Sequence, residues 1–279
     1  MRSRSILGLN PKGFHRLHYM EWGSPDDPTV VCVHGLSQNA HSFDTLAGKL
    51  EAAHRVACLD VVGRGQSGWL DDPAGYNYAQ YMADANALIA RLGVDRIDWV
   101  GTSMGGIIGM MIAAMANSPI RRLVINDIGP FVPKAALRRI GAYMTQENRF
   151  ADLAAFEAYL REVYAPFGSL SDDQWHQMVR HGARRNDDGS ISPSYDPAIA
   201  DAFRNGPMSD VDLWPVWDAI RCPTLVLRGG DSDVLLADTV AAMTQRGPKA
   251  TVLEFAGIGH APALQSDDQI AAIRSFLGA

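Results

Sequence analysis

Ser103 lies in the segment Gly101-Thr102-Ser103-Met104-Gly105, a G-x-S-x-G pattern in which the central serine can act as a nucleophile. The apolar run Ile97–Val100 before it is typical of a strand, and the run Ile107–Ala116 after it is typical of a helix. A sharp turn between two such elements holds the hydroxyl clear of the sheet, at a helix N-terminus that favours negative charge. We therefore predict that Ser103 is a catalytic nucleophile.

A serine nucleophile needs a general base, and His260 is the best placed of the eight histidines. It lies in the loop Gly257-Ile258-Gly259-His260-Ala261-Pro262, which follows the last predicted strand, Thr251–Phe255. A loop at that end of the sheet can reach across the strand ends to Ser103. Apart from His34, which is discussed below, the other histidines lie on a predicted edge strand or on helices, where surface or capping roles are the default.

The carboxylate that orients His260 is expected in the loop after the apolar run Thr224–Leu227. Two aspartates compete there, Asp231 and Asp233. We favour Asp233, because the apolar step Val234–Leu236 after it leads into the next helix, and we expect the other aspartate to cap the turn or the helix.

Two other aspartates end predicted strands. Asp127 ends the strand after the nucleophile helix, where an alternative triad acid can be housed, but we rank it behind the two aspartates of the later loop. Asp60 ends a strand and opens the glycine-rich segment Asp60-Val61-Val62-Gly63-Arg64-Gly65-Gln66-Ser67, and we expect it to serve the structure.

Two backbone amides are candidates for an oxyanion hole. His34-Gly35-Leu36 follows the apolar strand Thr29–Val33, and a His-Gly pair allows the backbone to aim the Leu36 amide at a substrate. Met104, the residue after the nucleophile, supplies the second amide. His34 itself is expected to be structural, with its ring bonded to the loop backbone.

The elements that position these residues alternate between strand and helix. Short apolar strands separated by helices such as Tyr78–Leu92 predict a doubly wound, mostly parallel α/β sheet that is covered on both faces. From Phe131 to Leu213 no convincing strand is present and helical spacing dominates. We therefore predict an α/β core formed by residues 1–130 and 214–279, with an all-helical cap inserted at 131–213.

The composition is that of an ordinary globular protein, with 47% apolar and 20% charged residues and a formal net charge of −6. No run of like charges indicates a nucleic-acid or membrane partner. The three cysteines, Cys32, Cys58 and Cys222, show no metal-ligand spacing and are expected to be reduced. We expect a cytoplasmic protein without cofactor or metal; the sequence does not indicate its oligomeric state.

These motifs, in this order, resemble the alpha/beta-hydrolase superfamily over essentially the whole chain. The matching segments are His34-Gly35, Asp60–Ser67, Gly101–Gly106 and Gly259-His260. The resemblance implies a helical cap inserted after the sixth strand and a triad of serine, acid and histidine. The acid loop departs from the family pattern, because Ala237 stands where a proline is usual, and this leaves the identity of the acid open.

The resemblance also narrows the chemistry. Epoxide hydrolases and haloalkane dehalogenases carry an aspartate in place of Ser103. Carbon–carbon bond hydrolases of aromatic degradation share a stretch like Ser103–Gly106, but they usually carry a more glycine- and proline-rich loop than Leu36–Asn39. Cofactor-free perhydrolases or haloperoxidases use the same triad. A non-catalytic receptor is least favoured, because all three triad residue types are present.

A carboxylesterase or lactonase acting on a small or oligomeric ester needs the fewest additional assumptions. The aromatic and methionine residues of the cap predict an apolar acyl pocket; they are Tyr143, Met144, Trp175 and Met178, with Trp214 and Trp217 at the cap's C-terminal hinge. Arg184 and Arg185 are the cap cations that could meet a substrate carboxylate, although we favour a solvated turn for them.

Overall fold

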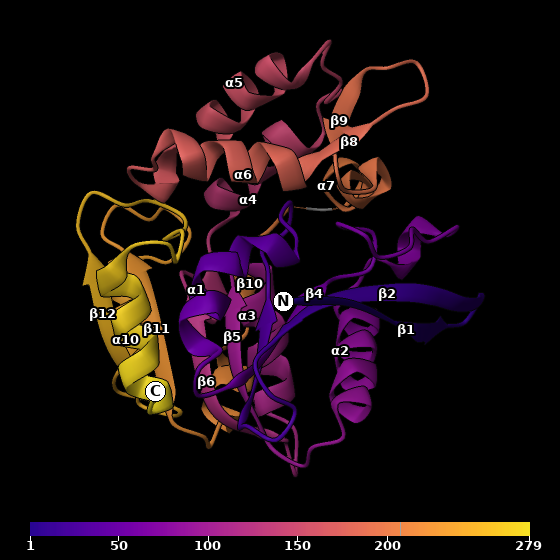
Figure 1. Ribbon diagram of the computed structural model, residues 1–279. Helices are drawn as coiled ribbons and strands as arrows, with labels where there is room; N and C mark the ends of the chain where they lie inside the picture. The colour runs from indigo at the N-terminus through magenta and orange to yellow at the C-terminus, as the bar shows by residue number, and fades with distance from the viewer. Residues whose placement is uncertain (207) are drawn as a thin grey trace.

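A computed structural model describes residues 1–206 and 208–279 of the chain (Figure 1). Its centre is an eight-stranded sheet in the order β1-β2-β4-β3-β5-β6-β11-β12. The strands are β1 (Arg2–Asn10), β2 (Gly13–Trp22), β3 (Thr29–Val33), β4 (Arg55–Asp60), β5 (Ile97–Thr102), β6 (Ile120–Asn126), β11 (Thr224–Gly229) and β12 (Thr251–Phe255). From β4 to β12 neighbouring strands run parallel, whereas β1 and β2 are antiparallel, so the predicted fold class is confirmed.

Alternate residues of the buried strands pack against opposite helical layers. In β3, Val31 and Val33 belong to a core cluster shared with α2 (Tyr78–Leu92), α3 (Met104–Ala113), α8 (Trp214–Ala219) and α9 (Ala237–Met243). Val30 and Cys32 face a second cluster with α1 (Asp44–Leu50) and α10 (Asp267–Leu277). Every residue of β3 is buried, as a parallel strand covered on both faces requires. Because both faces are covered, functional groups gather at the carboxyl edge of the sheet.

The segment between β6 and α8 lies above that carboxyl edge (Figure 1). Its helices are α4 (Lys134–Met144), α5 (Leu153–Val163), α6 (Asp172–Gly182) and α7 (Asp201–Asn205). It contains a small apolar cluster of its own, formed by Phe156, Leu160, Tyr164, Phe167, Trp175, Val179 and Ile191. Several aromatic side chains of the segment belong to this cluster, so they pack within the cap itself.

The segment is not all-helical, which corrects the expectation from the sequence. Strands β8 (Ala183–Arg185) and β9 (Ile191–Pro193) form an antiparallel hairpin around a polar turn. Strand β7 (Phe131–Val132) pairs with β10 (Val211–Asp212) where the chain leaves the core and returns to it. Strands of two or three residues are too short to show an alternating pattern. We keep 131–213 as the proposed cap; residue 207 within it lies outside the described residues.

Two further sequence expectations concern the chain as a whole. Cys32, Cys58 and Cys222 are all free thiols. Within residues 1–206 and 208–279, no helix combines the length and the apolar character needed to cross a membrane. The sequence pattern does not predict strand β1, because it is the exposed edge of the sheet and its side chains lack a clear apolar face.

Candidate active site

Ser103 occupies the sharp turn between β5 and α3 with φ 50° and ψ −113°, a conformation that a residue with a side chain rarely adopts. Its amide donates to the carbonyl of Asn126 at 2.9 Å. Glycines on both sides make the turn possible: a Cβ on Gly101 would overlap the Gly105 carbonyl oxygen, and one on Gly105 would overlap the Val33 carbonyl oxygen. The G-x-S-x-G pattern therefore reflects close backbone packing around the serine.

The Gly105→Ala variant is expected to unfold at a clearly lower denaturant concentration than the wild type. Its new methyl group would overlap a backbone oxygen of β3, and that oxygen cannot move without disturbing the sheet. We expect the free energy of unfolding to fall by about 3 kcal/mol or more. Gly48→Ala is the matched control, because Gly48 is exposed in α1 and a Cβ added there would have no other atom within 4 Å. That change is expected to stabilise slightly. Equal effects of both substitutions in urea unfolding would contradict this account.

His260 lies on the loop after β12 and connects Ser103 to a buried carboxylate. Its Nε2 is 2.9 Å from Ser103 Oγ, and its Nδ1 is 2.8 Å from Asp127 Oδ2. The side-chain amide of Asn126 donates to the Pro262 carbonyl at 2.8 Å and so holds the histidine loop to the end of β6. This arrangement provides a nucleophile, a base in contact with it and an acid that orients the base.

The acid in contact with His260 is Asp127, not Asp233. Asp127 directly follows β6 and is completely buried. Its Oδ1 accepts from the Gly229 amide at 2.8 Å, and its Oδ2 accepts from Ser232 Oγ at 2.6 Å. Three donors thus surround the carboxylate, if the Nδ1–H of His260 is included. The loop that was expected to supply the acid instead supplies Ser232, a positioning residue that the sequence reasoning missed.

Asp233 and Asp231 point elsewhere. Both oxygens of Asp233 bind Arg139 of α4, at 2.6 and 2.8 Å, so this aspartate joins the acid loop to the cap. Partial burial raises the pKa of Asp233, but the bonds to Arg139 outweigh it and the net pKa is lowered. Asp231 is exposed, and its backbone amide donates to the Ile258 carbonyl. Neither aspartate hydrogen-bonds to His260 among the contacts that the described residues make.

The order of the strands in the sheet makes Asp127 a candidate for the acid. β6 and β11 are parallel neighbours with Asn126 opposite Leu227, so the residue after β6 and the loop after β11 meet at the same edge. An aspartate that ends β6 is therefore as close to the histidine loop as one in the later loop. Spacing along the chain does not distinguish the two positions, whereas the contact with Arg139 does.

The loop that carries the predicted oxyanion amide is held rigidly. The Gly35 amide is satisfied by the Gln38 side chain, and a Cβ on Gly35 would lie 3.7 Å from Ser103 Cβ. The carbonyl of Leu36 accepts from Nε of the fully buried Arg64 at 3.0 Å, which fixes the next peptide. Met104 is the first residue of α3, where a helix has no internal acceptor for its amide. We keep the Leu36 and Met104 amides as the proposed oxyanion donors.

Two groups near this loop have the structural roles that the sequence suggested. His34 is buried, its Nδ1 contacts the Gly35 carbonyl, and its Nε2 accepts from the Val61 amide. Burial lowers the pKa of His34 to about 4, so the ring is neutral. Asp60 is buried as well and accepts from His18 and from the Ala40 amide.

A cavity of about 270 Å³ lies between the cap and the core, next to the loop of Gly35. Its core wall includes Ser37 and Ala263, which lie close in sequence to Leu36 and His260. Four tyrosines line it, namely Tyr143, Tyr159, Tyr164 and Tyr195, together with apolar residues that include Phe156, Leu160, Val163, Phe167 and Met178. The cavity is therefore partly apolar, and its polar lining combines the four phenolic hydroxyls with amide and charged side chains such as Gln177 and Gln265. Ser103 and His260 are not among its lining residues, so an apolar acyl pocket beside the triad stays a prediction.

Several residues that the sequence proposed for the pocket are elsewhere. Trp175 is buried in the apolar cluster of the cap, whereas Met144 and Trp217 are buried in the core cluster shared with the sheet. Arg184 and Arg185 are exposed on β8, and the Arg184 guanidinium stacks 4.2 Å from the centre of the Trp69 ring. Neither arginine lines the cavity under the cap.

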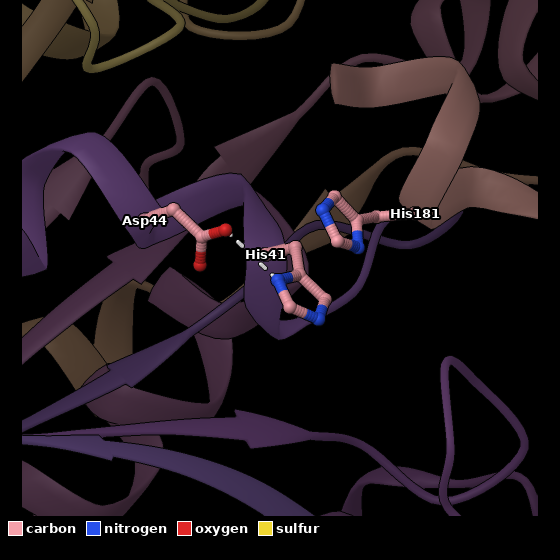
Figure 2. Close-up of side chains that lie close together, drawn as sticks. All are labelled: His41, Asp44 and His181. Carbon is pink, nitrogen blue, oxygen red and sulfur yellow. Dashed lines mark hydrogen bonds and ion pairs between the residues drawn. The ribbon is translucent and has the colours of Figure 1, made fainter. Parts of the chain in front are cut away.

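One group of side chains has the composition and spacing of metal ligands, among the residues that the structure describes. It consists of His41, Asp44 and His181 (Figure 2). The sequence assigned only surface or capping roles to these histidines, because they lie on predicted helices. They are brought together where α6 of the cap meets the start of α1.

Comparison with known proteins is consistent with this architecture. The family model described as "Alpha/beta hydrolase family" matches residues 30–273 of the chain. The chain therefore belongs to the alpha/beta hydrolase family, and it is a hydrolase.

Individual relatives cover nearly the whole chain. The 3-hydroxybutyrate-oligomer hydrolase of Cupriavidus necator is 42% identical over 277 residues, which are 96% of this chain and 94% of that protein. An esterase of Mycobacterium tuberculosis is 30% identical over 81% of this chain and 74% of its own. A crystal structure of an alpha/beta hydrolase from Novosphingobium aromaticivorans superposes with a TM-score of 0.88 at 35% identity, and covers 99% of this chain and 98% of its own.

Proposed function

We propose that this protein is a serine esterase that cleaves short oligomers of 3-hydroxybutyrate or of a similar hydroxy acid. The observation that carries the esterase part is the chain of hydrogen bonds from Ser103 through His260 to Asp127, at 2.9 and 2.8 Å. The oligomer part is supported by the similarity to the hydrolase of Cupriavidus necator over 96% of the chain.

In the first half of the reaction, Ser103 Oγ attacks the ester carbonyl carbon while its proton passes to His260 Nε2. The carbonyl oxygen gains the negative charge and binds the amides of Leu36 and Met104. Each such donor stabilises the transition state by about 2.7–4 kcal/mol. Asp127 keeps Nδ1 of His260 protonated, so Nε2 is free to accept the proton of Ser103. The Asp127 carboxylate then stabilises the imidazolium that forms.

Collapse of this intermediate breaks the ester C–O bond. The alkoxide leaves with the proton from His260 Nε2, and the acyl group remains on Ser103 Oγ. Water then enters, gives one proton to His260 and attacks the acyl carbon. The second intermediate collapses by the same steps, Ser103 recovers its proton, and the acid product leaves.

The tyrosine hydroxyls of the cavity suit a substrate with more than one ester group. An oligomer of a hydroxy acid carries a carbonyl acceptor in every unit, whereas a simple alkyl chain carries none. Burial raises the pKa of Tyr143 to about 12, and burial also raises the pKa values of Tyr159, Tyr164 and Tyr195. All four phenols are therefore protonated at neutral pH and can donate. Tyr164 already shares its hydroxyl with Ser37 Oγ at 2.9 Å.

The wild-type protein tests the proposal on two substrate series. We expect release of 3-hydroxybutyrate from its dimer, trimer and tetramer, measured by chromatography, and turnover of p-nitrophenyl esters from acetate to a long acyl chain. Turnover of p-nitrophenyl esters without any cleavage of the oligomers would remove the oligomer assignment and leave a general esterase. No turnover in either series, with folded protein, would contradict the esterase proposal itself.

The Tyr143→Phe variant is expected to raise KM for the hydroxybutyrate trimer several-fold, with a smaller change for p-nitrophenyl butyrate. The lost hydroxyl contributes about 1 kcal/mol when it donates to a substrate carbonyl, and p-nitrophenyl butyrate has no second ester carbonyl. Tyr78→Phe on α2 is the control, since Tyr78 does not line the cavity. The same change in KM for both substrates would show that Tyr143 does not hydrogen-bond to the second ester group.

A further inference from the structure

The cluster of His41, Asp44 and His181 joins two parts of the molecule. His41 lies in the short helix η1 (Ala40–Phe43), Asp44 begins α1, and His181 lies in the last turn of α6 in the cap. Figure 2 shows the two imidazole rings stacked against each other beside the aspartate. The ring centroids are 3.7 Å apart, and His41 Nδ1 is 2.8 Å from Asp44 Oδ2. One possible ligand atom from each residue lies within 4.8 Å of the others.

One atom of the cluster lacks a partner. Asp44 Oδ1 is buried and has no hydrogen-bond partner among the described residues. The Asp44 side chain as a whole is 35% exposed, so its carboxylate can be reached by a ligand from solvent. The donor set of two imidazoles and one carboxylate is that of sites for zinc and similar borderline ions.

We propose that His41, Asp44 and His181 bind a divalent transition metal ion, with Zn²⁺ as the representative case. Three protein ligands leave a fourth tetrahedral position open to water. All three residues also line the cavity under the cap, so the open position is accessible from that cavity. The bound ion ties α6 of the cap to the start of α1 in the core.

Binding needs a small rearrangement of the rings. The two imidazoles are within 17° of parallel, and lone pairs in parallel planes do not converge on one point. Metal binding therefore requires one of the rings to turn, and both rings line the adjoining cavity.

Calorimetric titration of the wild-type protein with ZnCl₂ tests the site without any use of catalysis. We expect one ion per chain and a rise in Tm with Zn²⁺ concentration. His181→Gln and His41→Gln are each expected to weaken binding by at least about tenfold. His176→Gln is the matched control, because His176 lies on the same helix, its side chain is 62% exposed, and its Nε2 is 3.8 Å from Glu157 Oε2. It is expected to bind like the wild type.

A second variant separates this site from the triad, whose His260 and Asp127 also offer ligand atoms. His260→Ala is expected to retain one Zn²⁺ per chain. Loss of binding in His260→Ala with retention in His181→Gln would place the ion at the triad and overturn the proposal. So would the absence of any binding to the wild type. Because the readout is binding, neither result depends on whether the protein is an esterase.

Discussion

The Asp127→Asn variant is expected to lose about 10⁴-fold in kcat on a p-nitrophenyl ester, whereas Asp233→Asn keeps most of the wild-type rate. The carboxylate of Asp127 accepts from the Gly229 amide, from Ser232 Oγ and from His260 Nδ1. An asparagine has only one acceptor oxygen, so its NH₂ group must face one of these donors. If the NH₂ group faces His260, Nδ1 must act as the acceptor and the ring proton lies on Nε2. The ring can then no longer accept the proton of Ser103.

Asp233→Asn removes a different interaction. Asp233 and Arg139 are 47% and 40% exposed, and an ion pair with that exposure contributes at most about 1 kcal/mol. We therefore expect a small change in stability and a rate within severalfold of the wild type. The comparison of kcat for the two purified variants, with circular dichroism as a check of folding, decides between the two acids. A larger loss in Asp233→Asn than in Asp127→Asn would restore Asp233 to the triad.

The Ser103→Ala variant is expected to lose about 10⁶-fold in kcat. The methyl group leaves no nucleophile, and only the oxyanion amides and binding contribute to the residual rate. The strained backbone at Ser103 is kept by the packing of Gly101 and Gly105, so the variant is expected to fold.

Covalent labelling provides an independent readout for Ser103. A fluorophosphonate probe is expected to label the wild type once per chain and to leave Ser103→Ala unlabelled. Ser275→Ala is the control, because Ser275 is an exposed serine on α10, and its labelling and turnover are expected to match the wild type. Labelling of Ser103→Ala at wild-type speed, or its full activity, would mean that another residue is the nucleophile.

Local patterns in the sequence determined much of this protein. Apolar residues at helical spacing predict a helix at Tyr78–Leu92, which are the bounds of α2, and a glycine follows it in the left-handed conformation that ends such helices. The turn at Ser103 could be predicted because its geometry needs Gly101 and Gly105 within a few residues. The position of His260 beside Ser103 could be predicted because its loop follows a parallel strand and therefore starts at the edge of the sheet where Ser103 lies. Each of these inferences depends on contacts between near neighbours in the chain or on the edge at which parallel strands end.

Only the tertiary structure decided between the carboxylates. Asp127 and Asp233 follow adjacent strands and lie at the same edge of the sheet. Their positions in the sequence therefore do not show which of them contacts His260. The choice depends on partners from distant segments: Arg139 of the cap binds Asp233, while Ser232 and the Gly229 amide hold Asp127 toward His260. The pairing of His41 with His181 is decided in the same way, by the docking of α6 on the core. Such contacts come from packing between elements, and the sequence of either element alone does not contain them.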